Sequence, residues 1–186
     1  MKHWIVITLV GSDRPGIVAA ISKILFRYRC NIAELSSTIL QRQFAMILIA
    51  TCPQKCALTK IKASCPKETA LQGMAIDVRE VSPERLKHAE KPPSQPFIIT
   101  VLGKDRPGLV YGVTEILAGH RINIANFDAT TTTMRGKADY AQIYEVEIPE
   151  AVDIPALKKD LAARAKKLKV DIDLKHRNIF RAINEI

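Results

Sequence analysis

The chain has 186 residues, of which 47% are hydrophobic and 25% are charged, and its formal net charge is +9. These are ordinary values for a globular protein, and no run of about 18 apolar residues is present that could form a membrane-spanning helix. The opening residues lack the length and the cleavage pattern of a signal peptide. We therefore expect a cytoplasmic protein with no membrane contact.

The positive charge is dispersed along the sequence. Its densest cluster is Lys166-Lys167-Leu168-Lys169, with further basic residues up to Arg177, and it lies beside Asp171 and Asp173. A solvated surface explains this cluster. Contact with a polyanion or an acidic protein is the alternative.

A segment of the first half of the chain recurs in the second half. Residues 8–37 align without a gap with residues 100–129, and 13 of these 30 positions are identical. The repeat predicts two small domains of similar size rather than one larger domain. We expect them at 1–81 and 97–186, with a Pro-rich linker at 82–96.

The first copy alternates between β-branched apolar runs and segments of helical periodicity. Pro15 is expected in the first turn of its first helix, and Pro66 is expected to kink or split its second helix. In chain order we predict a strand at 4–10, a helix after residue 15, strands at 31–40 and 44–52, a second helix and a strand at 75–81.

The second copy repeats this order. Its second helix is marked by Asp153 as the N-cap and by Pro155 in the first turn. We also expect a short terminal helix at 178–186, with Ile179, Phe180 and Ile183 facing inward. The predicted strands of the second copy are 97–102, 123–133, 138–148 and 170–175.

The order β-α-β-β-α-β, found twice, predicts the fold class. It is the ferredoxin-like arrangement, in which a four-stranded antiparallel sheet carries two helices on one face. The chain is therefore expected to be an α+β protein with two ferredoxin-like domains. Domains this small bury little surface alone, so a homodimer or packing between domains is expected.

The cysteines and histidines do not form a recognisable reactive group. Cys52, Cys56 and Cys65 lack the paired spacing of a zinc site, and Cys30 aligns with Ile122, which predicts a small buried hydrophobic residue. The four histidines are scattered, and no catalytic triad, nucleophile elbow or phosphate-binding loop is present. We predict no metal, no cofactor and no catalytic residue.

The turn between the first strand and the first helix of each copy has the form Gly-x-Asp-Arg-Pro-Gly. Glycine lets the chain bend, free N–H groups at the helix start attract a carboxylate, and the aspartate offers a counter-charge for an ammonium group. Asn31 and Asn123 are expected beside the turn of their own copy, as donor and acceptor. Alternatively, the aspartate caps the helix, and glycine and proline only form the turn.

The residues Gly11-Ser12-Asp13-Arg14-Pro15-Gly16, followed after one helix by Asn31-Ile32, resemble the ACT domain, a small regulatory module of amino-acid metabolism. The resemblance covers nearly the whole chain as two modules. It implies that an effector amino acid binds at an interface between modules. The candidate ligand-binding residues are Gly11, Asp13, Arg14, Gly16, Asn31 and Ile32 in the first copy, and Gly103, Asp105, Arg106, Gly108, Asn123 and Ile124 in the second.

Two modules without an enzyme domain are similar to the glycine-cleavage-system transcriptional repressor group. This similarity implies a non-catalytic regulator that binds an amino acid and acts through a protein partner such as a transcription regulator. The alternative is a repressor that binds DNA directly. The sequence shows no helix-turn-helix, zinc finger or stacking aromatic pair, so direct contact with nucleic acid is not expected.

Overall fold

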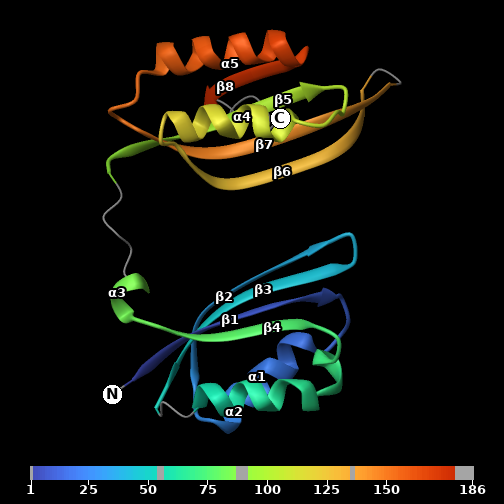
Figure 1. Ribbon diagram of the computed structural model, residues 1–186, viewed down its shortest axis with the longest axis vertical. Helices are drawn as coiled ribbons and strands as arrows, with labels where there is room; N and C mark the ends of the chain where they lie inside the picture. The colour runs from blue at the N-terminus through green and yellow to red at the C-terminus, as the bar shows by residue number, and fades with distance from the viewer. Residues whose placement is uncertain (1, 54–56, 87–91, 135–136, 179–186) are drawn as a thin grey trace. The chain divides into compact units, whose positions relative to one another are not determined.

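The computed structural model describes residues 2–53, 57–86, 92–134 and 137–178 (Figure 1). The chain divides into two compact units, Met1–Ala89 and Glu90–Ile186. Among the described residues, no helix has both the length and the apolar character needed to cross a membrane.

The described residues of the first unit form four strands and two main helical segments. Its strands pair in the order β2-β3-β1-β4, and every pairing is antiparallel. The helices lie on one face of the sheet (Figure 1). Its elements are β1 (His3–Ser12), α1 (Ile17–Arg27), β2 (Asn31–Leu40), β3 (Gln43–Cys52), α2 (Ala57–Ser64), the 3-10 turns η1 (Cys65–Lys67) and η2 (Thr69–Leu71), β4 (Ala75–Val81) and the short helix α3 (Pro83–Leu86).

The second unit has the same topology, with the strand order β6-β7-β5-β8. Its helices also lie on one face of the sheet (Figure 1). Its elements are β5 (Ser94–Gly103), α4 (Leu109–Gly119), β6 (Asn123–Met134), β7 (Lys137–Pro149), α5 (Ile154–Leu168) and β8 (Asp171–His176). Both units are four-stranded antiparallel sheets with helices, so the predicted α+β ferredoxin-like class is confirmed.

Each core lies between the sheet and the helices. In the first unit, alternate residues of the central strand β1 point to the helices: Ile5, Ile7 and Leu9 are at most 1% exposed. The residues of α1 at helical spacing, including Ile17, Ile21 and Ile24, cover them. Apolar residues recur at every second position of the strand and with a period of 3.6 residues on the helix, and this spacing places their side chains in one layer.

The second core has the same position but contains a polar pair. Tyr144 and Gln142 on β7 are both fully buried, and the Tyr144 hydroxyl donates to Oε1 of Gln142 over 2.5 Å. Burial raises the pKa of the Tyr144 hydroxyl far above its usual value. The Phe127 ring stacks on Tyr144 with 4.5 Å between the ring centroids.

Several details of the sequence prediction are confirmed. The bounds of β2 and β4 are as predicted, and α2 stops at Ser64, with Pro66 in the 3-10 turn that follows. The carboxylate of Asp153 caps α5 by accepting from the Ala156 N–H over 3.2 Å, and Pro155 lies in the first turn of α5.

Other details differ from the prediction. Helix α1 begins at Ile17, so Pro15 precedes the helix and lies in the turn. The predicted linker 82–96 contains α3 and the start of β5, because Ser94, Gln95 and Pro96 pair with the end of β7. Ile179, Phe180 and Ile183 of the predicted terminal helix lie outside the described residues.

Candidate functional site

The second glycine of the repeated motif sets the backbone of the turn. Gly16 is the N-cap of α1 with φ +94°, and Gly108 is the N-cap of α4 with φ +92°. This left-handed conformation strains any residue that carries a Cβ atom. A Cβ atom at Gly108 would meet no other atom within 4 Å, so the backbone angle rather than crowding requires glycine there.

The first glycine has a different role from the one predicted. Gly11 belongs to β1 and pairs with Phe44, and it does not bend the chain. A Cβ atom at Gly11 would lie 3.0 Å from Cγ of Met74, and one at Gly103 would lie 2.6 Å from Cγ1 of Val170. Glycine therefore lets the segment before the last strand of each unit pass close to the central strand.

Arg14 and Arg106 anchor the turn within their own unit. The guanidinium of Arg14 donates to the Gln72 carbonyl, and that of Arg106 donates to the Lys169 carbonyl over 3.2 Å. Both carbonyls belong to the segment that leads into the last strand. The Nε atoms of both arginines are buried without a hydrogen-bond partner among the described residues. The motif arginines thus stabilise the fold by binding the turn to the segment before the last strand.

Asp13 and Asp105 are exposed carboxylates of the turns, and in the second turn Lys104 is exposed as well. Neither helix start receives a side-chain capping bond, so the alternative in which the aspartate caps the helix is wrong. The first intrahelical bonds run from Ala20 to the Gly16 carbonyl and from Gly112 to the Gly108 carbonyl. The N–H groups of the first three helical residues therefore have no acceptor within the helix.

The sequence reasoning placed the asparagines beside the turn of their own unit. The structure contradicts this. Asn31 pairs with Thr51 on β3, and Thr51 pairs with Trp4 at the start of β1. Gly11 lies seven positions further along β1, which is about 23 Å at 3.3 Å per residue. In the second unit Asn123 likewise pairs with Glu147 at the far end of the sheet.

The reason is the split β-α-β connection. The chain returns through α1 to the end of the sheet where β1 began, so β2 and β1 start at the same end and run in the same direction. Gly11, Asp13, Arg14 and Gly16 are therefore one group, and Asn31 with Ile32 forms another. In the second unit the two groups are Gly103, Asp105, Arg106 and Gly108 on the one hand, and Asn123 with Ile124 on the other.

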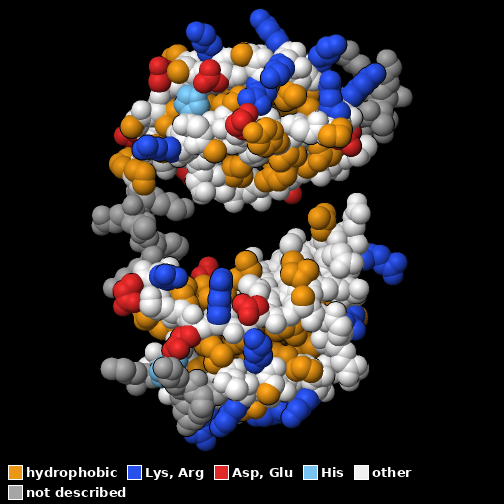
Figure 2. All heavy atoms as spheres, viewed as in Figure 1, with side chains coloured by type: hydrophobic (Ala, Val, Ile, Leu, Met, Phe, Trp, Pro, Cys, Tyr) orange, Lys and Arg blue, Asp and Glu red, His pale blue; other side chains and the backbone are white. Residues whose placement is uncertain are grey.

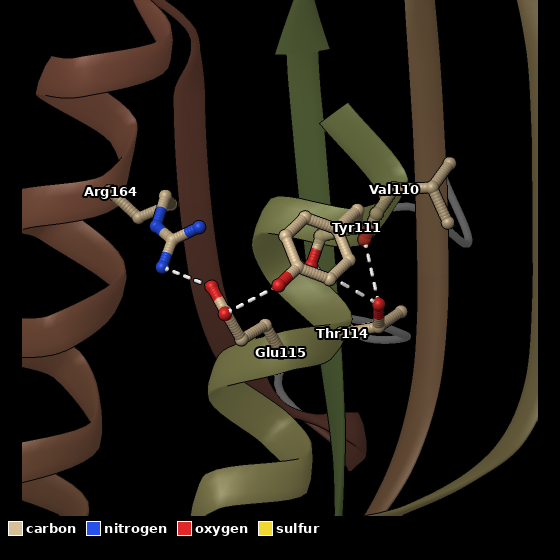
Figure 3. A network of polar contacts seen from close by, with 5 residues as sticks. All are labelled: Val110, Tyr111, Thr114, Glu115 and Arg164. Carbon is tan, nitrogen blue, oxygen red and sulfur yellow. Dashed lines mark hydrogen bonds and ion pairs between the residues drawn. The ribbon is translucent and has the colours of Figure 1, made fainter. Parts of the chain in front are cut away.

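A polar network that includes Tyr111 flanks the turn of the second unit (Figure 3). The Tyr111 hydroxyl donates to Oε1 of Glu115 over 2.7 Å, and the Arg164 guanidinium donates to Oε2 of the same carboxylate over 2.7 Å. The hydrogen bond from Tyr111, followed by that from Arg164, lowers the pKa of Glu115, and the bond to Glu115 raises the pKa of Tyr111. The first unit has Ala19 at the position of Tyr111 in the repeat.

Sequence reasoning missed this network. The available signal was the spacing of Tyr111 and Glu115, because residues four apart meet on a helix surface. The ring of Tyr111 is 65% exposed beside the start of α4, so the two turns present different walls to solvent.

Sequence reasoning also missed a disulfide. Cys30 is bonded to Cys52, with 4.2 Å between their Cα atoms, so Cys30 is not the simple buried hydrophobic residue that was predicted. Cys65 is free and buried, and burial raises the pKa of its thiol. Within the described residues, no three metal-ligating side chains come together.

Grooves occur next to the last strand of each unit. The larger one, of about 770 Å³, lies between α5 and β8, and Gly103 and Lys169 are among its lining residues. The smaller one, of about 320 Å³, is lined by Gln72, Gly73 and Met74 among others. Both grooves border the segment that the motif arginine holds.

Comparison with known proteins shows the same module in duplicate. The ACT domain family matches residues 3–79 and again residues 95–175. A UPF0237 protein of Methanopyrus kandleri is 33% identical over 90 residues, which cover 48% of this chain and 96% of that protein. It thus has the length of one copy.

Two longer proteins resemble both copies together. The glycine cleavage system transcriptional repressor of Escherichia coli is 28% identical over 130 residues, covering 70% of this chain and 66% of that protein. The crystal structure of a protein from Galdieria sulphuraria, described as an unknown protein, superimposes with a TM-score of 0.75 at 26% identity, covering 95% of this chain and 99% of that chain. The chain belongs to the ACT domain family and consists of two ACT domains in tandem.

Proposed function

We propose that the protein is a non-catalytic regulator that binds an amino acid or a similar small polar ligand and thereby changes its association with a protein partner. The observation that carries the proposal is the exposed aspartate of each turn, Asp13 or Asp105, beside a helix start that has no side-chain cap. A carboxylate of the ligand suits the free N–H groups, and its ammonium suits the aspartate.

The similarity to a transcriptional repressor of E. coli supports a role in transcriptional control of amino-acid metabolism, with glycine as the first candidate ligand. The partner in this proposal is a protein such as a transcription regulator, and the site of action is the cytoplasm. Ligand binding shifts the equilibrium between partner-bound and free protein only if the ligand prefers one of these states.

We further propose that each complete site combines the turn of one ACT module with the start of the second strand of another module. Within one unit these two groups lie about 23 Å apart, too far for one amino acid to contact both. A site shared between modules brings Asp13 or Asp105 together with Asn31 or Asn123. The protein is accordingly proposed to form a homodimer.

Isothermal titration calorimetry with glycine and each of the other common amino acids tests the proposal. We expect at least one of them to bind, and we expect Asp13→Ala or Asp105→Ala to weaken that binding. The matched control is Asp77→Ala, which removes an exposed carboxylate from β4 at a distance from the turn. Absence of binding by every amino acid would sink the proposed function.

Double-mutant cycles on the bound amino acid identify the modules that share a site. Two substitutions in one site are expected to be non-additive, whereas substitutions in separate sites add. Coupling of Asp13→Ala with Asn123→Ala indicates that a first module shares its site with a second module. Coupling of Asp13→Ala with Asn31→Ala indicates that two first modules, from two chains, share a site. Additivity in both cycles would contradict a site shared between modules.

A second candidate function, direct binding of DNA, has one observation in its favour. Figure 2 shows a row of basic side chains over α5. Lys158, Lys159, Lys166 and Lys167 on this helix are exposed, and they form no ion pair among the described residues. Retention of the purified chain on DNA that falls steeply with salt and is lost in Lys166→Glu/Lys167→Glu would favour this function over a protein partner.

A further inference from the structure

The disulfide of the first unit lies directly beside one of the candidate ligand-binding groups. Cys30 immediately precedes Asn31, and Cys52 is the last residue of β3, next to Thr51, the partner of Asn31. The bond joins residues 22 positions apart. It therefore ties the start of β2 covalently to the end of β3.

The second unit fills the same place without a covalent bond. Ile122 takes the position of Cys30 in the repeat. Ile148 takes that of Cys52, because it follows Glu147, the partner of Asn123, as Cys52 follows Thr51. Both isoleucines are buried, at 6% and 1% exposure. Packing alone thus completes the module, so the fold does not require the bond between Cys30 and Cys52.

The segment that the disulfide holds is short and lies at a free edge. Asn31 and Ile32 pair with Thr51 and Ala50, and then a bulge at Ala33 interrupts the ladder. Strand β2 is an edge strand, and all of its residues are exposed. When the disulfide is opened, the start of β2 is held without a covalent bond, by the two pairs between Cys30 and the bulge and by the bond from the Cys30 N–H to the Leu25 carbonyl.

We propose that Cys30 and Cys52 form a thiol–disulfide exchange site that controls how firmly Asn31 is held, so that the first ACT module responds to redox state and the second does not. The reaction partners are low-molecular-weight thiols and disulfides of the glutathione class. Any effect on an effector at Asn31 rests on the proposed function, whereas the redox control of the strand does not.

The chemistry follows from the different exposure of the two cysteine residues. Cys30 is half-buried and Cys52 is 1% exposed, so an incoming thiolate attacks Sγ of Cys30. The bond to Cys52 breaks, a mixed disulfide forms at Cys30, and Cys52 leaves as a thiolate that takes up a proton. A second glutathione thiolate then attacks the mixed disulfide, releasing oxidised glutathione and the Cys30 thiolate, which is protonated. Oxidised glutathione drives the reverse reaction, in which the cysteine pair loses two electrons.

A redox titration tests the exchange itself. The protein is equilibrated with mixtures of reduced and oxidised glutathione, free thiols are alkylated, and Cys30 and Cys52 are quantified by mass spectrometry. Cys56→Ser/Cys65→Ala leaves only this pair, and peptide mapping of the wild-type chain provides the same readout without substitutions. We expect both thiols to convert together within the range of the mixtures. A pair that stays entirely reduced or entirely oxidised throughout would overturn the proposal.

Amide hydrogen exchange tests the mechanical effect. Reduction is expected to speed exchange at Asn31 and Ile32 and to leave Asn123 and Ile124 unchanged. The matched variant Cys30→Ile/Cys52→Ile installs the residues of the second unit, and its exchange at Asn31 should no longer depend on redox state. Equal exchange at Asn31 in the oxidised and reduced wild-type protein would refute control of the strand.

Ligand binding shows whether the control reaches the effector. Asp105→Ala is expected to weaken ligand binding at the turn of the second unit. This variant is then titrated, in the oxidised and in the reduced state, with the amino acid that the wild-type chain binds. We expect weaker binding after reduction. Equal affinities would contradict the link between the disulfide and the site. If no amino acid binds in either state, the proposed function fails, and the redox titration and the exchange data still decide the control of the strand.

Discussion

The two ACT units reach the same fold with different interiors. Leu9 of the first unit pairs with Met46, and Val101, its counterpart in the repeat, pairs with Gln142. Likewise Ile7 pairs with Leu48, whereas Ile99 pairs with Tyr144. The left-handed glycine and the arginine hydrogen bond of the turn are the same in both units. The buried side chains and the residue beside the helix start differ, and the disulfide occurs in the first unit. Duplication has therefore preserved what sets the chain path and varied what fills the space around it.

The single tryptophan allows the two units to be compared in one molecule. Trp4 lies on β1 of the first unit, so its fluorescence reports on that unit alone. Far-UV circular dichroism reports on both units. Guanidinium denaturation followed by both signals therefore separates the free energies of unfolding of the two units.

The largest expected difference concerns the first glycine of the motif. Gly103→Ala should lower the free energy of unfolding of the second unit by about 3 kcal/mol, because its Cβ atom meets the stiff side chain of Val170 at 2.6 Å. Gly11→Ala should cost the first unit about 1 kcal/mol, since rotation of the unbranched Met74 side chain can move its Cγ away from the new methyl group. Adding Val170→Ala to Gly103→Ala should recover part of the loss, and equal costs in both units would refute this explanation.

The polar pair of the second core should give the next largest effect. Tyr144→Phe leaves both polar atoms of the buried Gln142 side chain unpaired, since its Nε2 already lacks a partner among the described residues. We expect a loss of about 2 kcal/mol in the circular dichroism transition and none in the fluorescence transition. Gln142→Met/Tyr144→Leu, which installs the residues of the first core, should cost less than Tyr144→Phe. A double variant less stable than the single one would contradict the role assigned to the unpaired amide.

The motif arginines should contribute equally to the two units. Arg14→Met and Arg106→Met each remove a hydrogen bond from a guanidinium to a carbonyl, and each should lower the stability of its own unit by about 1.5 kcal/mol. Arg79→Met, on the exposed face of β4, serves as the control and should change stability by less than about 0.5 kcal/mol. Unequal losses in the two units would show that the shared turn is not held in the same way.

The smallest effect is an increase in stability at the helix ends. Arg29 and Arg121 have left-handed backbones, with φ 55° and φ 56°. Arg29→Gly and Arg121→Gly should each raise the stability of their unit by about 0.5 kcal/mol, because relief of strain slightly exceeds the entropy that glycine adds to the unfolded chain. Arg27→Gly, at the last residue of α1, should instead lower stability by about 1 kcal/mol, because it weakens the helix and removes the ion pair of Arg27 with Glu68. A loss at Arg29 or Arg121 would mean that the two arginine side chains stabilise the helix ends.

The sequence predicted the parts of the fold that depend on local chemistry. Periodicity located β2 and β4, Pro66 marked the end of α2, and Asp153 marked the start of α5. It also located the repeated turn, because Asp-Arg-Pro-Gly is unusual enough to recognise twice.

The errors concern relations between distant segments. The placement of Asn31 beside the turn failed because the direction of β2 is set by the β-α-β crossover and not by nearness in sequence. The bond between Cys30 and Cys52 depends on strand register, and the requirement for Gly11 depends on the approach of Met74. These relations exist only after β1, β3 and β4 have paired, so local patterns did not reveal them.

The bulge that interrupts the second strand of each unit, at Ala33 and Ala125, has an evolutionary consequence. Ala33 is the unpaired extra residue of its bulge, so a chain that lost it and kept the register of Leu35–Leu40 would still hold Asn31 opposite Thr51, on the same face of the sheet. A gap of one residue at this position in an aligned relative would therefore leave the binding group in place, whereas a gap elsewhere in the strand would shift its register by one residue and reverse its faces.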